Sequence, residues 1–349
     1  AKHRITLFSY VNKNDERSKP MKKYIVGLVS IFLFIMLSAC DQENSQQEKI
    51  HVAEVTHSLF YAPFYVALSE GFFTEEGLNV SYQTVPGGDK TMTALLSDAV
   101  DIALVGPETS IYVYGQNAKD PVVSFAQLTQ KDGTFLVARN PQSEFSFSQL
   151  KDSVFLGQRQ GGMPQMVGEF VLRKHQIDPQ RDLTLIQNID FGNIPSAFIS
   201  GTGDYVQLFE PTATIFEEEG RGQIVASFGE ASGLIPYTVF MAKTSYVNQN
   251  SELVSRFTKA IYKAEQFVAQ KDAATIAKAV YPYFKETDLA TITKVIKRYQ
   301  IQDTYAKNPI IDETEWQNLL EIMKQSGVIQ ADVPYQVLVN TEIAKTSMK

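Results

Sequence analysis

The sequence predicts an α/β protein of two lobes, each built on a mainly parallel sheet that helices flank. Two observations carry this prediction. Strand-like and helix-like segments alternate from residue 49 to about residue 230, an order that is typical of parallel sheets covered by helices. From Ser251 to Gln325, apolar residues instead recur at three- and four-residue spacing, which predicts a helical C-terminal third. A chain of 349 residues has room for about two domains.

The first 49 residues lie outside the expected fold. Residues 1–20 are polar and aperiodic, and we interpret them as sequence upstream of the biological start at Met21. Residues 21–39 combine two lysines, an apolar stretch and small residues, which is typical of a secretory signal peptide. The stretch LSAC then ends at Cys40 and resembles a bacterial lipobox, which implies lipidation of Cys40; the alternative is a plain signal peptide with an incidental cysteine. After the lipidated cysteine, the polar composition of residues 40–49 predicts a flexible tether.

The charge of the exported chain excludes some partners. Removal of residues 1–39 takes away seven basic and two acidic residues, which leaves 25 basic and 37 acidic residues and a net charge of −12. An acidic surface argues against nucleic acid as a partner. It also argues against polybasic membrane binding, so we expect the lipid alone to anchor the chain to the outer face of the cytoplasmic membrane.

The first lobe begins with a β-α-β-α-β order. The expected strands and helices alternate at 49–55, 61–73, 78–85, 87–99 and 100–106, and strands at 122–129 and 134–139 follow.

A second α/β unit resembles the first. It begins with a strand at 153–159, a helix at 163–174 and a strand at 183–189. A shift of 103 residues places 94–111 on 197–214 without a gap, with four identities. The alternative explanation is that any two βα units look somewhat alike. Either way, the sequence predicts two similar α/β lobes.

The lobe boundaries follow from the C-terminal part. A further strand is expected at 234–243, and we expect the helical tail to pack on the first lobe. The first lobe would then comprise residues 50–138 and 235–349, and the second lobe residues 139–234. Two chain crossings, near 134–142 and 230–238, would form a hinge.

Several of these segments resemble the NMT1/THI5-like group of ABC transporter substrate-binding proteins, of the SsuA/ThiY type, which have the periplasmic-binding-protein type II fold. The resemblance covers nearly all of residues 50–340, and its carriers are 61–80, 94–109, 157–164 and 201–213. It implies a receptor that closes on a small ligand in a cleft between its lobes and delivers it to a permease powered by a separate ATPase. Relatives in this group bind thiamine pyrimidine precursors, aliphatic sulfonates, nitrate or riboflavin-like compounds, and the fold does not choose among them.

The ligand of such a protein lies beyond the carboxyl ends of the strands. The candidate ligand residues are therefore the ring-bearing His57, Phe60, Tyr61, Phe191 and Tyr237, the acids Asp89, Glu108 and Glu210, the helix-start residues Gly88, Gly161, Gly162 and Met163, and the cation Arg159.

Each kind of candidate has a structural alternative. The aromatic rings are equally typical of core, and His57 suits the cap of a turn. Asp89 suits a helix N-cap, and Glu108 suits the first helical turn, where a carboxylate favours the helix dipole. The glycines permit tight strand-to-helix turns, and Arg159 suits an ion pair on the lobe surface.

Glu210 is the preferred ligand contact at this stage. Pro211 restricts Glu210 to an extended backbone at the strand end, where a buried and unpaired carboxylate would be costly. An amino-pyrimidine stacked on aromatic rings would satisfy it. The structural alternative is an ion pair with Arg159 or Lys90. A sulfonate, taurine or nitrate remains the alternative ligand, although three carboxylates near the cleft would repel it.

No standard catalytic motif is present, so we expect no enzyme, no cofactor and no metal. The four histidines lack metal-ligand spacing. A pyrimidine synthase of the same superfamily carries a cysteine-rich iron-binding stretch, whereas Cys40 is the only cysteine here. An adhesin would need no cleft. We expect a monomer that contacts its ligand, its permease and, through the lipid, the membrane.

Overall fold

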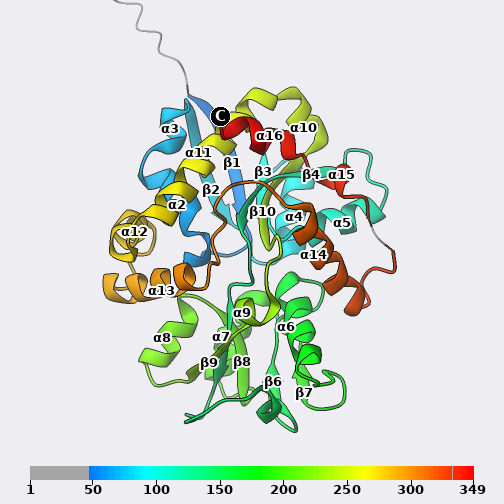
Figure 1. Ribbon diagram of the computed structural model, residues 1–349, viewed down its shortest axis with the longest axis vertical. Coiled ribbons are helices and arrows are strands. Elements are labelled where there is room, and N and C mark those ends of the chain that lie inside the picture. Colours follow the sequence, from blue (N-terminus) through cyan, green and yellow to red (C-terminus); the bar gives the residue numbers. More distant parts are fainter. Residues whose placement is uncertain (1–46, 332) are drawn as a thin grey trace, which may run out of the picture. The chain divides into compact units, whose positions relative to one another are not determined.

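The computed structural model describes residues 47–331 and 333–349, and the strands of these residues form two five-stranded sheets (Figure 1). In spatial order, the first sheet contains β2 (Leu78–Thr84), β1 (Glu48–Glu54), β3 (Ile102–Val105), β10 (Thr238–Lys243) and β4 (Val122–Thr129). The second sheet contains β7 (Thr184–Ile186), β6 (Val154–Leu156), β8 (Tyr205–Phe209), β5 (Thr134–Ala138) and β9 (Gln223–Ser227).

The two sheets have the same pairing pattern. In the first sheet β1 pairs in parallel with β2 and β3, and β10 pairs antiparallel with β3 and β4. In the second sheet β6 pairs in parallel with β7 and β8, and β5 pairs antiparallel with β8 and β9. The α/β fold predicted from the sequence is confirmed, with the detail that each sheet has a parallel half and an antiparallel half.

The antiparallel strand of each sheet follows a chain crossing. The chain leaves the first sheet after β4, crosses at residues 130–133 and enters the second sheet as β5; it returns after β9 and re-enters the first sheet as β10. The sequence predicts a division at residue 138, with 134–138 in the first lobe. That boundary is wrong, because β5 pairs with β8 and β9 of the second sheet. The cause of the difference is that β4 and β5 are both buried at every position, so their patterns do not say which sheet each one joins.

Helices cover both sheets. Beside the first sheet, or in the C-terminal part that packs mainly on it, lie η1 (Leu59–Tyr61), α2 (Ala62–Ser69), α3 (Phe72–Glu75), α4 (Gly88–Leu96), α5 (Glu108–Gly115), α10 (Thr244–Gln249), α11 (Ser251–Gln270), α12 (Ala273–Val280), η4 (Tyr281–Tyr283), α13 (Leu289–Ile301), α14 (Glu313–Gln325), α15 (Tyr335–Leu338) and α16 (Thr341–Ser347). The chain between β5 and β10 carries η2 (Phe147–Leu150), α6 (Met163–Lys174), η3 (Phe191–Asn193), α7 (Ile194–Ile199), α8 (Thr212–Glu218) and α9 (Phe228–Ser232).

The C-terminal helices connect to both sheets. The long amphipathic helix α11 buries Phe257, Ile261 and Ala264 and packs on α2, α3 and α16 (Figure 1). Two other helices of this region contact the second lobe, since α13 touches α8 and α14 touches α6. The tail therefore packs mainly on the first sheet, as the sequence predicts, and also bridges to the other one.

The N-terminal predictions fall outside the described part of the chain. The upstream segment 1–20, the signal peptide 21–39 and Cys40 all precede residue 47, and β1 begins within the predicted tether, at Glu48. Within residues 47–331 and 333–349, no helix has both the length and the apolar character that a bilayer span requires.

Candidate ligand cavity

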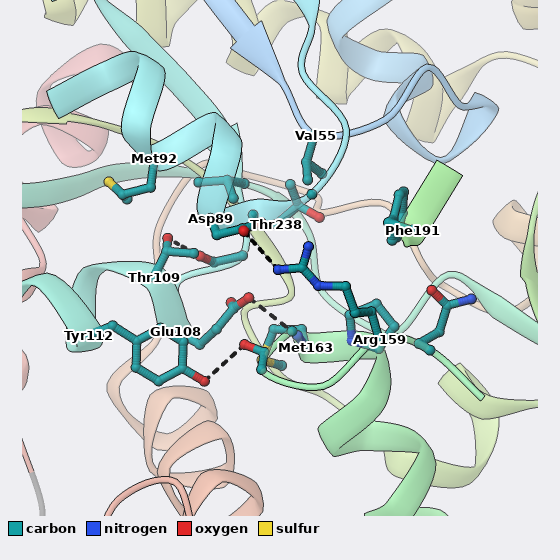
Figure 2. Close-up of a pocket in the computed structure, with 18 of the residues that line it drawn as sticks. Val55, Asp89, Met92, Glu108, Thr109, Tyr112, Arg159, Met163, Phe191 and Thr238 are labelled. Carbon is teal, nitrogen blue, oxygen red and sulfur yellow. Dashed lines mark hydrogen bonds and ion pairs between the residues drawn. The ribbon is translucent and has the colours of Figure 1, made fainter. Parts of the chain in front are cut away.

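A cavity of about 430 Å³ lies where strand ends and helix starts of both sheets meet (Figure 2). The first sheet contributes Val55 after β1, Gly87 to Asp89 at the start of α4, Thr238 at the start of β10 and, after β3, Gly106, Glu108 and Thr109. The second contributes residues 158–164 after β6, Phe191 after β7, and Phe209 at the end of β8. These are mainly the carboxyl ends of the parallel strands, the position where open α/β sheets bind ligands.

Three polar contacts cross this cavity from the first-sheet helices to the segment after β6 (Figure 2). The Oε1 atom of Glu108 accepts a hydrogen bond from the backbone N–H of Met163 at 3.2 Å. The hydroxyl of Tyr112 donates to the backbone oxygen of Gly161 at 3.0 Å. A guanidinium nitrogen of Arg159 lies 2.7 Å from Oδ2 of Asp89. These contacts hold the two sides of the cavity together.

Glu108 is a buried acid in this wall. It begins α5, and only 3% of its surface is exposed. Its Oε2 atom has no hydrogen-bond partner among the described residues and lies against Gly106, where an added Cβ would approach it within 2.0 Å. Glycine is therefore required at position 106 if the carboxyl group is to keep this place. Burial raises the pKa of Glu108 to about 8, against the opposing effect of its own backbone N–H and that of Met163.

The positive charge at the cavity is already paired. Among the described residues that line it, Arg159 alone is cationic, and it contacts Asp89 at 2.7 Å and Asp190 at 3.8 Å. The partial burial of Asp89 raises its pKa, but the hydrogen bond and charge of Arg159 outweigh this and hold the pKa below its usual value. An incoming anion would have to compete with both of these carboxylates.

Aromatic rings make up much of the remaining wall. Tyr61, Tyr112, Phe191, Phe209 and Tyr237 all line the cavity. They offer flat apolar surface for a planar ligand, with phenolic hydroxyls at several edges.

Phe60, expected to face the ligand, lies in the layer behind this wall. It is fully buried, and its ring centroid lies 5.6 Å from that of Phe209 and 5.5 Å from that of Tyr237. Its ring also packs against Gly133, where an added Cβ would come within 2.4 Å. Phe60 therefore supports the wall and does not form its surface.

His57 points away from the cavity. Its Nδ1 lies 3.1 Å from a carboxylate oxygen of Glu54 and its Nε2 lies 2.8 Å from the backbone oxygen of Tyr283, while its ring stacks on Phe284. Burial lowers the pKa of His57, but the hydrogen bonds to Glu54 and Tyr283 outweigh it and the net pKa is raised. This histidine ties the end of β1 to η4, which corresponds to the structural alternative named for it.

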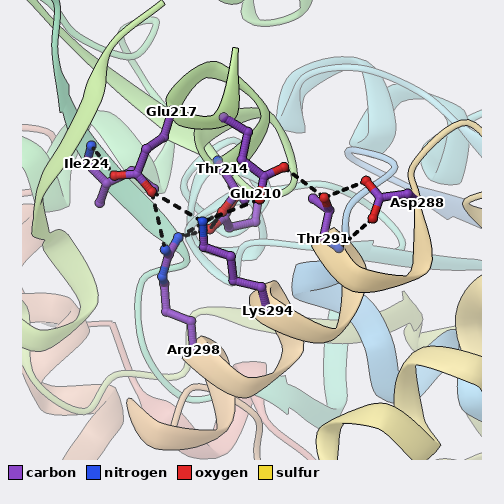
Figure 3. Close-up of polar contacts among 9 residues, drawn as sticks. Glu210, Thr214, Glu217, Ile224, Asp288, Thr291, Lys294 and Arg298 are labelled. Carbon is purple, nitrogen blue, oxygen red and sulfur yellow. Dashed lines mark hydrogen bonds and ion pairs between the residues drawn. The ribbon is translucent and has the colours of Figure 1, made fainter. Parts of the chain in front are cut away.

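Glu210 also has partners other than the cavity (Figure 3). One carboxylate oxygen accepts hydrogen bonds from Arg298 and from the Thr214 hydroxyl, and the other accepts from the Thr214 backbone N–H at 2.9 Å. Burial raises the pKa of Glu210, opposed by Arg298 and Thr214. The residue is absent from the cavity wall, and its ion pair is with Arg298 on α13 and not with Arg159 or Lys90. The expectation of a ligand-facing Glu210 is corrected accordingly.

The remaining candidate ligand residues from the sequence analysis all line this cavity. The cavity is lined by Tyr61, Gly88, Asp89, Glu108, Arg159, Gly161, Gly162, Met163, Phe191 and Tyr237.

The sequence analysis missed other wall residues, among them Met92, Tyr112 and Gln158. Tyr112 follows Glu108 by four residues and Met92 follows Asp89 by three, so helical spacing would have placed each on the same face as its neighbour. Gln158 directly precedes Arg159, and its amide donates to the backbone oxygen of Gln207 at 2.6 Å.

The described residues contain no group of three or more His, Cys, Asp or Glu side chains arranged to hold a metal ion. The site is an aromatic and acidic pocket between two similar α/β halves. Together, this fold and site define a bilobal solute-binding protein.

Comparison with known proteins identifies the family. The model of the family described as "NMT1/THI5 like" matches residues 60–274, and this chain belongs to that family. It is 59% identical over 316 residues to the "Putative binding protein YtlA" of Bacillus subtilis (strain 168), a match that covers 90% of this chain and 94% of the relative.

Solved structures confirm the periplasmic-binding-protein fold. The alkanesulfonate-binding protein SsuA from Xanthomonas axonopodis pv. citri, bound to MOPS, superposes with a TM-score of 0.69 at 14% identity, over 84% of this chain and 98% of that one. The periplasmic nitrate-binding protein NrtA from Synechocystis PCC 6803 superposes with a TM-score of 0.69 at 15% identity, over 86% and 88%. The chain is a solute-binding protein of the ABC-importer type.

Proposed function

We propose that this chain is the extracytoplasmic, lipid-anchored receptor of an ABC importer and captures a small, flat nitrogen heterocycle. A thiamine pyrimidine precursor, hydroxymethylpyrimidine or formylaminopyrimidine, is the ligand that we favour. The observation that carries the proposal is Glu108, a buried carboxyl group in the wall of an aromatic cavity, with one oxygen that no group in residues 47–331 or 333–349 hydrogen-bonds.

The chemistry of an amino-pyrimidine matches this wall. Its amino group donates hydrogen bonds, and the carboxyl group of Glu108 accepts them. Its ring presents two flat faces, for which Tyr61, Phe191 and Phe209 supply aromatic surface. A cavity of about 430 Å³ is of the size that small-molecule sites commonly have.

Capture works through differential affinity. The contacts from Glu108, Tyr112 and Asp89 to the segment after β6 form only when the two sides approach each other. A ligand that touches both sides adds its binding energy to that closed form alone and thereby favours it. We propose that the closed, monomeric receptor is then recognised by a permease that a cytoplasmic ATPase drives, with lipidated Cys40 as the membrane anchor. The proposal assigns no catalytic step to the chain.

An aliphatic sulfonate, taurine or nitrate is the second candidate. The glycine-led start of α6 and the guanidinium of Arg159 at the cavity favour an anion. Against this, the N–H of Met163 already donates to Glu108, and Arg159 is paired with two aspartates.

Native mass spectrometry distinguishes the candidates. Residues 41–349, which include the compact unit 47–349, would be purified without added ligand and then mixed with hydroxymethylpyrimidine, formylaminopyrimidine, riboflavin, taurine and nitrate. We expect a retained pyrimidine adduct, and its weakening in Glu108→Gln. The control is Glu265→Gln, which removes a buried carboxyl group outside the cavity wall. Retention of taurine or nitrate, with no pyrimidine bound, would refute the proposed ligand class.

A further inference from the structure

We infer that this cavity selects its ligand by positive charge, and that a flat cation with neighbouring N–H donors displaces the proton of Glu108 on binding. The inference rests on the proposed assignment of the cavity as the capture site and adds two features, a proton linkage and a positive charge on the ligand, so that an amino-pyrimidine would bind as its ring-protonated cation. The step is a simple exchange: the carboxylic acid O–H bond breaks, the proton passes to solvent, and the carboxylate that remains pairs with the cation.

The bonding state of Glu108 is the first support. An ionised carboxylate offers about four acceptor positions, and Glu108 receives one backbone hydrogen bond from across the cavity, at 3.2 Å. Its Oε2 receives none. In the absence of ligand, the neutral acid is therefore the favoured form in this buried place, and burial raises its pKa to about 8. A cation beside it would reverse that preference.

The second support is the charge around the cavity floor. Tyr61 interacts electrostatically with Glu54 and Glu108, and Tyr237 with Asp132 and Glu108, so three acids surround these two phenols. Glu54 and Asp132 are both fully buried. The cation Arg159 is paired with Asp89 at 2.7 Å. Glu54 is paired with His57 at 3.1 Å and Glu108 is protonated before binding, so the negative charge near the phenols that no cation compensates is mainly that of Asp132, which favours a positive ligand over an anion.

The groups that face Glu108 do not obscure its titration. The phenols Tyr61, Tyr112 and Tyr237 all have pKa values raised by burial, so they stay neutral near pH 8. The pKa of Asp89 is lowered and that of Arg159 is raised, each mainly by their mutual contact against the effect of burial, so this pair stays charged. Beyond Tyr237, Asp132 has a pKa that burial raises to about 6, which sets the lower limit of a useful pH range. Beyond Tyr61, His57 beside Glu54 has a pKa raised above 6.5, so it titrates within that range, and the Glu108→Gln variant is what assigns the slope to Glu108.

The expected pH dependence follows from linkage. Below pH 8, a cation must displace the proton of Glu108, so its affinity should rise about tenfold for each pH unit up to about pH 8 and then level off. A neutral ligand of the same shape displaces no proton and should show a flat profile.

Benzamidine, benzamide and benzoate form a suitable probe series, because they share one flat ring and differ in charge. Titration calorimetry of residues 41–349 between pH 6.5 and 9, in two buffers with different ionisation heats, would measure affinity and protons released. We expect benzamidine to bind best, with proton release and the tenfold slope below pH 8, benzamide to bind without a slope, and benzoate not to bind. This measurement needs only the unaltered protein.

Two variants identify the group responsible. Glu108→Gln keeps the shape and removes the charge, so benzamidine should lose both its advantage over benzamide and its pH slope. Glu265→Gln should retain both, because that carboxyl group does not line the cavity. Circular dichroism would verify that each variant is folded.

Three results would overturn the inference: benzoate binding as well as benzamidine, capture of none of the three at millimolar concentration, or an unchanged slope in Glu108→Gln. Capture of hydroxymethylpyrimidine together with any of these would leave the proposed function standing and remove charge selection alone. Capture of taurine or nitrate would instead remove the proposed function.

Discussion

The pair formed by Glu210 and Arg298 allows a quantitative test of what joins the second lobe to the C-terminal helices. Glu210, at the end of β8, is 1% exposed, and Arg298 on α13 has a side chain that is 21% exposed (Figure 3). Replacement of Arg298 by methionine leaves the carboxylate, among the described residues, with Thr214 as its remaining hydrogen-bond partner. Loss of one member of a buried ion pair costs about 3–5 kcal/mol, and we expect Arg298→Met to lower the free energy of unfolding by that amount at pH 7.

The pH dependence of this loss has a definite sign. Burial already raises the pKa of Glu210, and removal of the guanidinium raises it further. A group with a raised folded-state pKa contributes stability below its unfolded-state pKa and loses it as the pH rises. The unfolded-state pKa is common to both proteins, so the gap in stability depends only on the two folded-state pKa values of Glu210. The gap between Arg298→Met and the unaltered protein should therefore narrow as the pH falls from the higher Glu210 pKa of the variant to the lower one of the unaltered protein, and stay constant below it.

A double-mutant cycle isolates the pair. Glu210→Gln with Arg298→Met removes the unpaired charge and should recover about 2–3 kcal/mol relative to the sum of the single variants. Urea unfolding can be followed by the fluorescence of Trp316, the sole tryptophan of the chain, which is fully buried. Lys294→Met is the control, because this lysine pairs with Glu217 and Glu218 from an exposed position and should cost about 0–1 kcal/mol. A cost for Arg298→Met no larger than this control, or strict additivity in the cycle, would refute the reasoning.

Two further predictions concern a second buried acid and the membrane anchor. Glu265 in α11 is fully buried, and neither of its oxygens has a hydrogen-bond partner in the part of the chain that the structure describes. Burial raises its pKa well above the usual value. Relative to Glu265→Gln, the unaltered protein should lose up to about 1.4 kcal/mol of stability per pH unit above the ordinary glutamate pKa, measured by urea unfolding between pH 5 and 8; parallel pH profiles would contradict this. Cys40→Ala should release the exported protein from membranes in fractionation experiments, and continued recovery with the membrane would exclude the lipid anchor.

The sequence predicts the outline of the fold because periodicity is a local property. The strand and helix order, the repeat at 103 residues and the helical tail all follow from spacing within short windows. The structure confirms two similar α/β lobes, since β3 and α5 correspond to β8 and α8 at that offset and the two sheets share one strand order. The sheet that β5 joins depends on a crossing of four residues, 130–133, and no local pattern records it.

In the site, too, the sequence predicts what depends on the backbone path and misses what depends on distant side chains. The rule that ligands lie beyond parallel strand ends located Asp89, Glu108 and Arg159, because it concerns the backbone path. It failed for His57 and Glu210, whose side-chain directions are set by Tyr283 and Arg298. Tyr283 lies 226 residues after His57, and Arg298 lies 88 residues after Glu210, so no local sequence motif predicts either contact.

The two glutamates also show how a small change in sequence gives related positions different roles. At the offset of 103 residues, GPET at 106–109 corresponds to FEPT at 209–212, with the order of proline and glutamate reversed. Pro107 precedes Glu108, which becomes the first residue of α5 and bonds to Met163 across the cavity. Glu210 instead precedes its proline, remains before α8, and its carboxylate turns to the N–H of Thr214 inside that helix. In the second lobe, Glu210 thus stabilises the start of α8 and pairs with Arg298. In the first lobe, Glu108 lines the cavity and its Oε2 atom accepts no hydrogen bond from the described residues. For this reason we assign charge selection to Glu108.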